Sequence, residues 1–172
     1  ETTMILDGME INNKPLKDTI EAVSLNSAKD YLYSLIDGSE PLSKRTLLEL
    51  HGLIINKNID VQSGVFRKNE VKIKGSKHTP PSPLDIQNHI EEMFKWINRN
   101  QHKYNPIIVA SILHHWITWI HPFNDGNGRV SRLMLDFFLL QKGYPEIVIK
   151  IDNRDNYYDA LIVNSTVTGK EI

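Results

Sequence analysis

The chain contains no cysteine, which excludes disulfide frameworks, thiolate zinc sites and cysteine nucleophiles. That absence fits a reducing compartment, and we expect a cytoplasmic protein. The sequence also lacks an excess of charge of one sign, because 20 Lys and Arg residues face 21 Asp and Glu residues. No overall basic field is available to hold a nucleic acid or an anionic membrane surface, so neither is expected as a partner of this domain.

Long apolar runs are absent as well. The longest, such as residues 107–113, are far shorter than the roughly 20 residues that a membrane span needs. Residues 1–10 lack the basic start and apolar run of a signal peptide. The length of 172 residues is usual for one domain, so a single domain over residues 1–172 is expected. Because the sequence starts with Glu1 and not Met, we expect a piece of a longer protein.

What is present is mostly helical periodicity. Apolar side chains recur at three- to five-residue steps, and Pro, Gly and capping residues separate the periodic segments. The pattern predicts an all-α fold, a bundle of about seven or eight helices. The clearest predicted helices cover residues 16–36, 44–55, 85–100, 106–120, 129–141 and 153–164.

One segment has a different pattern. Several Gly and Pro residues within 60–83 exclude a helix there. Val71-Lys72-Ile73-Lys74 alternates apolar and polar side chains, which is typical of a short strand. We therefore predict a small β-hairpin, called the flap, over about residues 70–80.

The residues between two predicted helices, around 121–132, are suited to binding phosphates. Gly126 and Gly128 allow a backbone to approach a ligand closely, and they stand where a helix begins. Free N–H groups and the positive end of the helix dipole converge at such a point and attract anions. Arg129 and Arg132 are three residues apart, so both guanidinium groups can reach the same polyphosphate.

The same loop also offers a base and a metal ligand. His121 ends the preceding helix and can act as a general base near neutral pH. Asp125 is a hard oxygen ligand beside the phosphate site, suited to Mg²⁺ that keeps most of its waters. The alternative is an ordinary turn between helices with charges nearby. The combination of His, Asp, Gly-x-Gly and two spaced Arg residues favours a site.

Residues His121 to Arg132 read HPFNDGNGRVSR, which resembles the signature of the Fic family, H-x-F-x-(D/E)-G-N-G-R-x-x-R, at every fixed position. The similarity extends to residues 64–67, to 71–80 and to the helix before the motif. Tyr157-Tyr158 resembles the start of the family's closing helix. The likeness covers about residues 3–165 and implies the Fic fold.

The resemblance implies a protein adenylyltransferase, which moves AMP from ATP onto a Ser, Thr or Tyr hydroxyl of a target protein. His121 would deprotonate that hydroxyl, Phe123 would anchor the loop, and Asp125 would hold the Mg²⁺. The remaining motif residues would bind the nucleotide's phosphates: Gly126, Asn127, Gly128, Arg129 and Arg132. Tyr157 and Tyr158 would flank the adenine, although Ser165 stands where the family often has an Asn that contacts the base.

The flap would dock the target. An extended segment with unpaired backbone groups binds a peptide by β-augmentation without reading its side chains. The residues expected to do so are Val71, Lys72, Ile73, Lys74 and Gly75. The alternative is a solvated surface hairpin without this role.

A second resemblance concerns regulation. Many family members carry an inhibitory helix with the pattern (S/T)-x-x-x-E-(G/N), whose Glu pairs with the second motif Arg. Residues 2–12 resemble that helix, with Thr3, Asp7 and Gly8 at the fixed positions. Asp7 replaces the Glu and is one methylene shorter, so we expect weaker inhibition, or inhibition through a water molecule. The alternative is a chain start without an inhibitory role.

Other functions remain open at this point. The site would equally serve transfer from UTP, GTP or CDP-choline, removal of AMP from a target, or a nucleotide-binding regulatory module with vestigial transfer. Homodimers are frequent in the family, but no residue here establishes a dimer interface. His114 and His115 lack the spacing of a zinc site, and burial is expected for them. His51, His89 and His102 belong to no motif and are expected at the surface.

Overall fold

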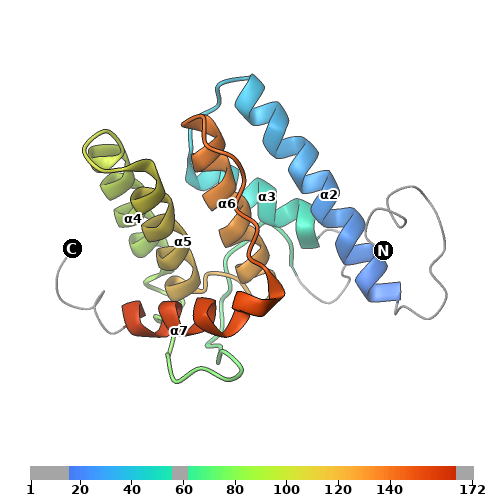
Figure 1. The fold of residues 1–172 in the computed structure, drawn as a ribbon. Helices are drawn as coiled ribbons and strands as arrows, with labels where there is room; N and C mark the ends of the chain where they lie inside the picture. The colour runs from blue at the N-terminus through green and yellow to red at the C-terminus, as the bar shows by residue number, and fades with distance from the viewer. Residues whose placement is uncertain (1–15, 56–61, 166–172) are drawn as a thin grey trace.

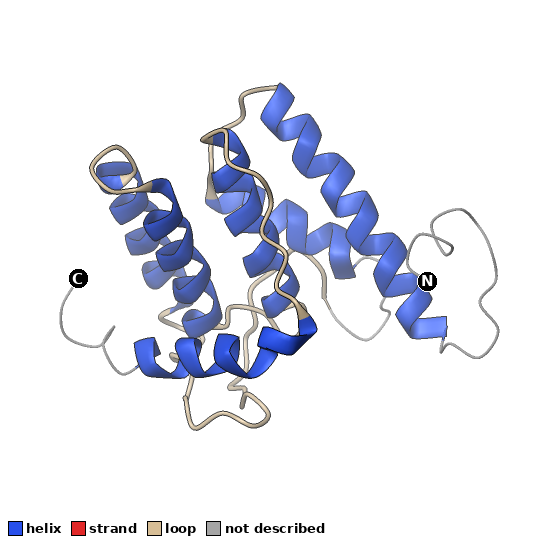
Figure 2. Ribbon diagram, in the orientation of Figure 1, coloured by secondary structure: helices blue, strands red, loops and turns tan. Residues whose placement is uncertain are grey.

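The computed structural model describes residues 16–55 and 62–165, and their regular structure is helical (Figures 1 and 2). Six α-helices and one short 3₁₀ helix occur in this part of the chain. In order they are α2 (Leu16–Asp37), α3 (Lys44–Ile55), α4 (Ile86–Asn100), α5 (Pro106–Ile120), α6 (Asn127–Gln141), η1 (Ile151–Asn153) and α7 (Arg154–Ser165). The predicted all-α class is thereby confirmed. The expected total of seven or eight included a helix within residues 2–12, which lie outside the described residues.

Local sequence explains where the helices that frame the site begin. The Ser43 hydroxyl accepts a hydrogen bond from the Thr46 N–H at 3.2 Å, so Ser43 caps α3 as its position in the sequence predicts. The Asn105 side chain likewise accepts from the Ile107 N–H at 2.9 Å. Pro106 follows at the first helical position, where no N–H is needed. The boundaries of α3 and α5 are therefore set by capping residues.

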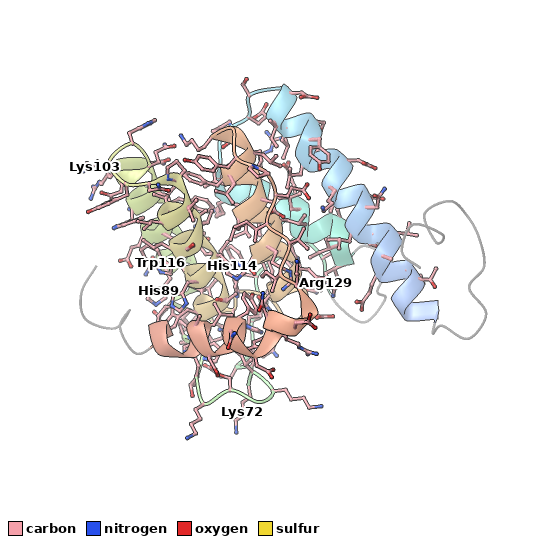
Figure 3. All side chains as sticks on the ribbon, viewed as in Figure 1. Lys72, His89, Lys103, His114, Trp116 and Arg129 are labelled. Atoms are coloured by element: carbon pink, nitrogen blue, oxygen red, sulfur yellow. The ribbon has the colours of Figure 1, made fainter. Side chains whose placement is uncertain are left out.

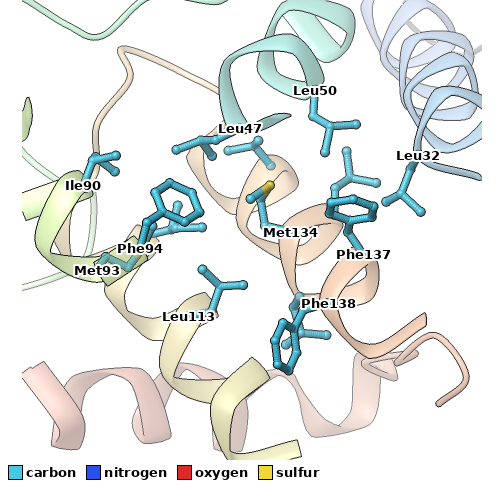
Figure 4. Close-up of a cluster of buried hydrophobic side chains, with 14 of the residues drawn as sticks. Leu32, Leu47, Leu50, Ile90, Met93, Phe94, Leu113, Met134, Phe137 and Phe138 are labelled. Atoms are coloured by element: carbon cyan, nitrogen blue, oxygen red, sulfur yellow. The ribbon is translucent and has the colours of Figure 1, made fainter. Parts of the chain in front are cut away.

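α5 and α6 form the most extensive helix pair and lie at the centre of the bundle. α4 packs on the other side of α5, while α2 and α3 pack on α6 (Figure 1). The core between them is made of Leu, Ile, Met and Phe side chains that are almost wholly buried (Figure 4). Its largest buried members include Phe123, Phe137 and Phe138. The two central helices therefore hold the loop between them, residues 121–126, at a fixed place.

α7 crosses the ends of α5 and α6 that lie next to this loop (Figure 1). It begins after the extended segment 144–150 and η1. The Tyr157 ring on α7 lies 5.7 Å from the His114 ring on α5, between ring centroids. α7 thus covers the end of the bundle at which the motif lies.

None of the helices in residues 16–55 and 62–165 combines the length and the hydropathy that crossing a bilayer requires.

The predicted β-hairpin is wrong for the described residues, because residues 71–80 form a loop with a turn at Lys74–Gly75 (Figure 2). The turn is closed by the Ser76 N–H donating to the Ile73 carbonyl at 3.1 Å. The returning arm does not pair with the outgoing one, since the His78 ring bonds the Trp119 carbonyl at 2.8 Å. Pro80 and Pro81 also have no N–H to donate. Because residues 71–75 are expected to dock a target, we call residues 71–76 the target loop.

Candidate active site

The backbone at His121 is held in an unusual conformation. α5 ends there, with His121 in the left-handed region at φ 49° and ψ 57°. Its N–H still donates to the Ile117 carbonyl, at 3.0 Å. A non-glycine residue in this region is uncommon and costs energy, and such strain gathers at functional sites. The turn ends the helix and redirects the backbone, and the imidazole lines a cavity.

The His121 ring is neutral at physiological pH. Burial lowers its pKa from the ordinary 6.5 to about 4, a hydrogen bond with the Thr118 backbone opposes that effect, and the positive charge of Arg67 adds to it. A neutral imidazole has a free nitrogen that can accept a proton. The group has the protonation state that a general base needs.

Two residues of the motif serve the loop's own structure. The Asn127 side-chain oxygen accepts from the Phe123 N–H at 2.9 Å, and its amide donates to the Phe123 carbonyl at 2.8 Å. This pair of hydrogen bonds closes the loop. Because both polar atoms of the Asn127 side chain are used, any contact of Asn127 with a ligand is left to its backbone. The Phe123 ring is fully buried and stacks on His51 from α3, with 3.6 Å between ring centroids and 6° between planes.

His51 is a site residue that the sequence did not indicate. We expected it at the surface, which is wrong: it is fully buried. Its Nδ1 accepts a hydrogen bond from the Gly64 N–H at 2.9 Å, which leaves Nε2 to donate to the Asp125 carbonyl at 3.1 Å. The ring therefore fastens the motif loop to α3 and to the start of the following loop. Only its place within an apolar helix face hinted at burial.

The buried histidines predict a loss of stability in acid. Burial lowers the pKa of His51, His114 and His121 to about 4 in the folded protein, whereas an unfolded chain has 6.5. As the pH falls, the unfolded state therefore binds protons before the folded state does. The stability of the folded state with respect to these rings is complete above about pH 6.5. It is lost as the pH falls toward 4, and the loss in the free energy of unfolding is on the order of 2 kcal/mol per ring by about pH 5.

Urea unfolding at about pH 7.5 and about pH 5 measures this change in the free energy of unfolding. His51→Gln is expected to reduce the pH dependence, whereas His102→Gln, on an exposed loop, is expected to leave it unchanged. Equal stability of the parent at the two pH values would contradict the neutral, buried state of these rings.

The two glycines at the start of α6 meet different requirements. Gly126 has φ 77°, and a Cβ there would lie 3.0 Å from Ile55 Cδ1, so both backbone and packing require glycine. A Cβ at Gly128 would have one near neighbour, the Arg132 Nη1 at 3.5 Å. Gly128 thus leaves the first turn of α6 open, with the Arg132 guanidinium above it. An anion placed there would meet backbone N–H groups and a cation together.

The two arginines do not share one position. The Arg129 guanidinium lies 3.4 Å from a carboxylate oxygen of Asp125 and 3.4 Å from one of Glu21 on α2. Arg132 is exposed and lines the cavity that contains His121. Both line a smaller neighbouring cavity of about 480 Å³. Only Arg132 lines the cavity that contains His121, while both arginines line the smaller one, so their joint contact with one polyphosphate stays a prediction.

A cavity of about 780 Å³ brings most of the predicted residues together. It lies between the target loop, the motif and α7. Its lining includes the following predicted residues: Lys72, Ile73, Lys74, Gly75, His121, Asp125, Asn127, Gly128, Arg132, Tyr157 and Tyr158. Val71, Gly126 and Arg129 are not among its lining residues.

A single carboxylate faces this cavity as a candidate metal ligand. One Asp125 oxygen accepts from the Gly126 N–H at 2.6 Å, and the side chain is 43% exposed. Among the described residues, no cluster of three or more His, Asp or Glu side chains forms a preformed metal cage. One exposed carboxylate still fits Mg²⁺, which is usually bound through one or two carboxylates together with substrate phosphates.

Arg67 is a further residue whose role the sequence did not reveal. Its side chain is 3% exposed and donates to four carbonyls: His121 at 2.8 Å, Pro81 at 2.6 Å, Asn69 at 3.0 Å and Ile120 at 3.4 Å. Its own N–H donates to the Pro122 carbonyl at 2.9 Å. It joins the start of the motif to both ends of the segment that carries the target loop.

Some predicted residues lie outside what the structure describes. These are the inhibitory residues Thr3, Asp7 and Gly8. The side chain of Ser165, at the position expected to contact the base, is also outside it.

Comparison with known proteins identifies the family of this chain. Residues 41–139 match the model of the Fic/DOC family, and they include the whole 121–132 motif. The chain is 32% identical to the protein adenylyltransferase Fic of Aedes aegypti over 165 residues, 95% of this chain and 32% of that protein. It spans about a third of the length of the curated relatives it matches.

Solved structures agree on the fold. Fic-1 of C. elegans, residues 134–508, superposes with a TM-score of 0.84 at 28% identity, covering 95% of this chain and 49% of that one. A Fic-domain signalling protein of Bacteroides thetaiotaomicron gives 0.83 at 29% identity, covering 93% and 62%. IbpAFic2 covalently tethered to Cdc42 gives 0.65 at 20% identity, covering 88% and 51%, which shows a common fold alone.

Proposed function

This chain belongs to the Fic/DOC family, and we propose that it is a protein adenylyltransferase that transfers AMP from ATP to a Ser, Thr or Tyr hydroxyl of a target protein. One observation carries the proposal. One cavity of about 780 Å³ is lined by three features: the neutral base His121, the open start of α6 with Arg132 above it, and the exposed target loop. Relatives of this chain that are named protein adenylyltransferases, such as that of Aedes aegypti, support the choice of reaction.

The proposed reaction is one displacement. The hydroxyl oxygen of the target attacks the α-phosphorus of ATP while its proton passes to the free nitrogen of His121. The bond between the α-phosphorus and the bridging oxygen breaks, and pyrophosphate leaves with that oxygen. A phosphoester of AMP then remains on the target. Since such transfer depends chiefly on positioning and charge stabilisation, the fixed place of His121 matters as much as its basicity.

The charge on the phosphates would be met by the start of α6. Its first N–H groups and the helix dipole favour an anion above Gly128, which has no side chain to block it. The Arg132 guanidinium above that turn would bind the phosphates furthest from the base. Arg129 would act from behind the loop, since it is held between Asp125 and Glu21.

Mg²⁺ fits this arrangement as a cofactor. Asp125 would hold it from the edge of the cavity, with the phosphates of ATP and water completing its ligands. When bound, the ion would neutralise part of the charge that develops on the leaving pyrophosphate.

The target protein would dock on the target loop. Lys72 is exposed on this loop, which projects from the end of the bundle below α7 (Figure 3). Its extended backbone is free to pair with a segment of another protein, which would present a hydroxyl to the cavity behind it.

Intact-mass measurement after incubation with ATP and Mg²⁺ tests the proposal, because self-modification reports activity when the target is unknown. The expected result is a gain of one AMP per chain. Parallel reactions with UTP, GTP and CDP-choline distinguish the donors. A gain with another donor alone would replace ATP in the proposal. No gain with any donor, even where calorimetry shows that ATP binds, would contradict nucleotidyl transfer.

Inhibition by the segment 2–12 is a second part of the proposal. Asp7→Ala is expected to raise the rate of self-modification several-fold, because it would release Arg132 from a competing carboxylate for the γ-phosphate of ATP. Asp7→Glu, with the longer side chain, is expected to lower the rate below that of the parent. The initial rate of AMP incorporation measures both. Equal rates for all three proteins would rule out an inhibitory role for Asp7.

A further inference from the structure

His114 makes a buried contact that the proposed reaction does not yet use. It lies on α5 and faces α6 and α7, and it is 5% exposed (Figure 3). Its Nε2 lies 2.8 Å from the hydroxyl oxygen of Tyr157 on α7. The Ser131 backbone on α6 also interacts with the ring and opposes the lowering of its pKa, although Nδ1 has no partner with good hydrogen-bond geometry. The Tyr157 contact is the well-formed hydrogen bond that orients this ring.

The Tyr157 hydroxyl has a second neighbour. Arg132 and Tyr157 line the same two cavities, so the guanidinium and the phenol are neighbours. Burial raises the pKa of Tyr157, and the charge of Arg132 and its polar contact with the phenol oppose the rise. A guanidinium only donates hydrogen bonds, so in this contact the Tyr157 oxygen is the acceptor. The phenolic hydrogen is then left for His114, whose Nε2 must accept it. Burial lowers the pKa of His114 to about 4, which keeps that nitrogen free.

These contacts form a directed chain from Arg132 to Tyr157 to His114, which we call the arginine chain. It joins one residue from each of α6, α7 and α5. Its outer end is the exposed guanidinium whose Nη1 stands above Gly128 at the phosphate side of the cavity. A long exposed arginine loses much side-chain entropy when it is fixed for a ligand. A partner that holds it beforehand removes part of that cost.

We propose that His114 is a positioning residue, which fixes the Tyr157 hydroxyl so that it holds Arg132 ready for the terminal phosphates of the nucleotide. The inference rests on the proposed function for the identity of the ligand, since it takes that ligand to be a nucleoside triphosphate. By this proposal His114, which lies outside the 121–132 motif, affects how strongly the site prefers a nucleotide with more phosphates. His114 itself touches no ligand in this proposal.

Affinities for ATP and AMP, measured by calorimetry with Mg²⁺, test this role. His114→Leu keeps the buried volume and removes the acceptor, and Tyr157→Phe removes the hydroxyl but keeps the ring. Each is expected to weaken ATP binding about tenfold, the order of one hydrogen bond to a charged group. Each should leave AMP affinity within about twofold, because AMP lacks the phosphates that Arg132 would meet. The double variant is expected to be no weaker than the poorer single variant.

His115→Leu is the matched control. His115 is the next residue of α5, is 8% exposed, and has no hydrogen-bond partner on either ring nitrogen. Its replacement removes a buried imidazole without touching the arginine chain, so the ratio of ATP to AMP affinity should stay at the parent value. His114→Gln, which retains an acceptor, is expected to recover part of the lost ATP affinity.

Three results would overturn the proposal. They are an unchanged ATP affinity in Tyr157→Phe, an equal weakening of ATP and AMP, or additive effects in the double variant. If His114→Leu fails to fold, Tyr157→Phe and its ATP-to-AMP ratio still decide the question. A parent that binds ATP but transfers nothing would overturn the proposed function and leave the arginine chain intact, since these measurements need no transfer.

Discussion

His121→Ala is expected to lower AMP transfer by about a thousandfold, the scale of losing a positioned general base. The structure gives the reason. Burial lowers the pKa of this ring to about 4, so its nitrogen is free at neutral pH and faces the cavity of about 780 Å³. Alanine removes the proton acceptor that the left-handed turn at the end of α5 holds in the cavity. The initial rate of AMP incorporation, followed by intact mass, measures the loss.

ATP affinity separates a chemical role from a binding role. His121→Ala should bind ATP within about twofold of the parent, since the phosphates would be held at Gly128 and Arg132. His102→Ala, exposed on the loop between α4 and α5, is the control and should transfer AMP at the parent rate. Transfer by His121→Ala within tenfold of the parent would contradict the assignment of the base.

The pH dependence of the rate gives an independent check. The neutral form of His121 is the active one, so activity is lost as the pH falls through its pKa in the folded protein. With that pKa lowered to about 4, the rate should change little between about pH 8 and about pH 6. A fall in rate centred on pH 6.5, the ordinary value, would show that the ring is not desolvated in the active state.

The parts of the site that could be predicted are those that lie next to one another in sequence. Residues 121–132 contain a base, a carboxylate, two glycines and two arginines, and their spacing alone indicates that they meet at a helix start. The residues that hold this loop come from far away in the chain. His51 reaches Asp125 across 74 positions, and Arg67 reaches His121 across 54. No local pattern encodes such contacts.

The helices were predictable for a related reason. The spacing of apolar residues and the caps at Ser43 and Asn105 depend on neighbours within one turn. The conformation of residues 70–80 was not predictable in this way. Alternating apolar and polar side chains allow a strand to form, but they do not show which other strand it would pair with. In the structure His78 bonds the Trp119 carbonyl on α5, and the returning arm follows that contact. A tertiary hydrogen bond therefore overrode a local β pattern.

Arg67 is the second residue whose replacement should have a large effect. Its guanidinium donates to the carbonyls of His121, Pro81 and Asn69, with a longer contact of 3.4 Å to that of Ile120. Burial lowers the pKa of this arginine, which shows how far the group is removed from water. Arg67→Leu would leave these carbonyls without their partner, each at a cost of about 1–3 kcal/mol where water cannot replace it.

We expect Arg67→Leu to lower the free energy of unfolding by about 3–5 kcal/mol, the range for breaking a buried charged network. Urea unfolding followed by circular dichroism measures it. Arg45→Leu is the matched control, because the Arg45 side chain is 79% exposed and pairs with Glu49 on the same helix. That change should leave the free energy of unfolding close to the parent value, because an exposed ion pair contributes little. Equal costs for the two variants would contradict the role given to Arg67.

Arg67→Lys distinguishes the geometry of the group from its charge. One ammonium cannot reach the carbonyls of His121, Pro81 and Asn69 together, as a planar guanidinium with five donors does. Lysine should therefore restore little of the stability. Transfer should fall further than stability alone explains, since the same contacts fix the backbone of the base and both ends of the target loop's segment. A stable Arg67→Lys protein with parent-like transfer would show that charge suffices, and that the left-handed turn at His121 maintains itself.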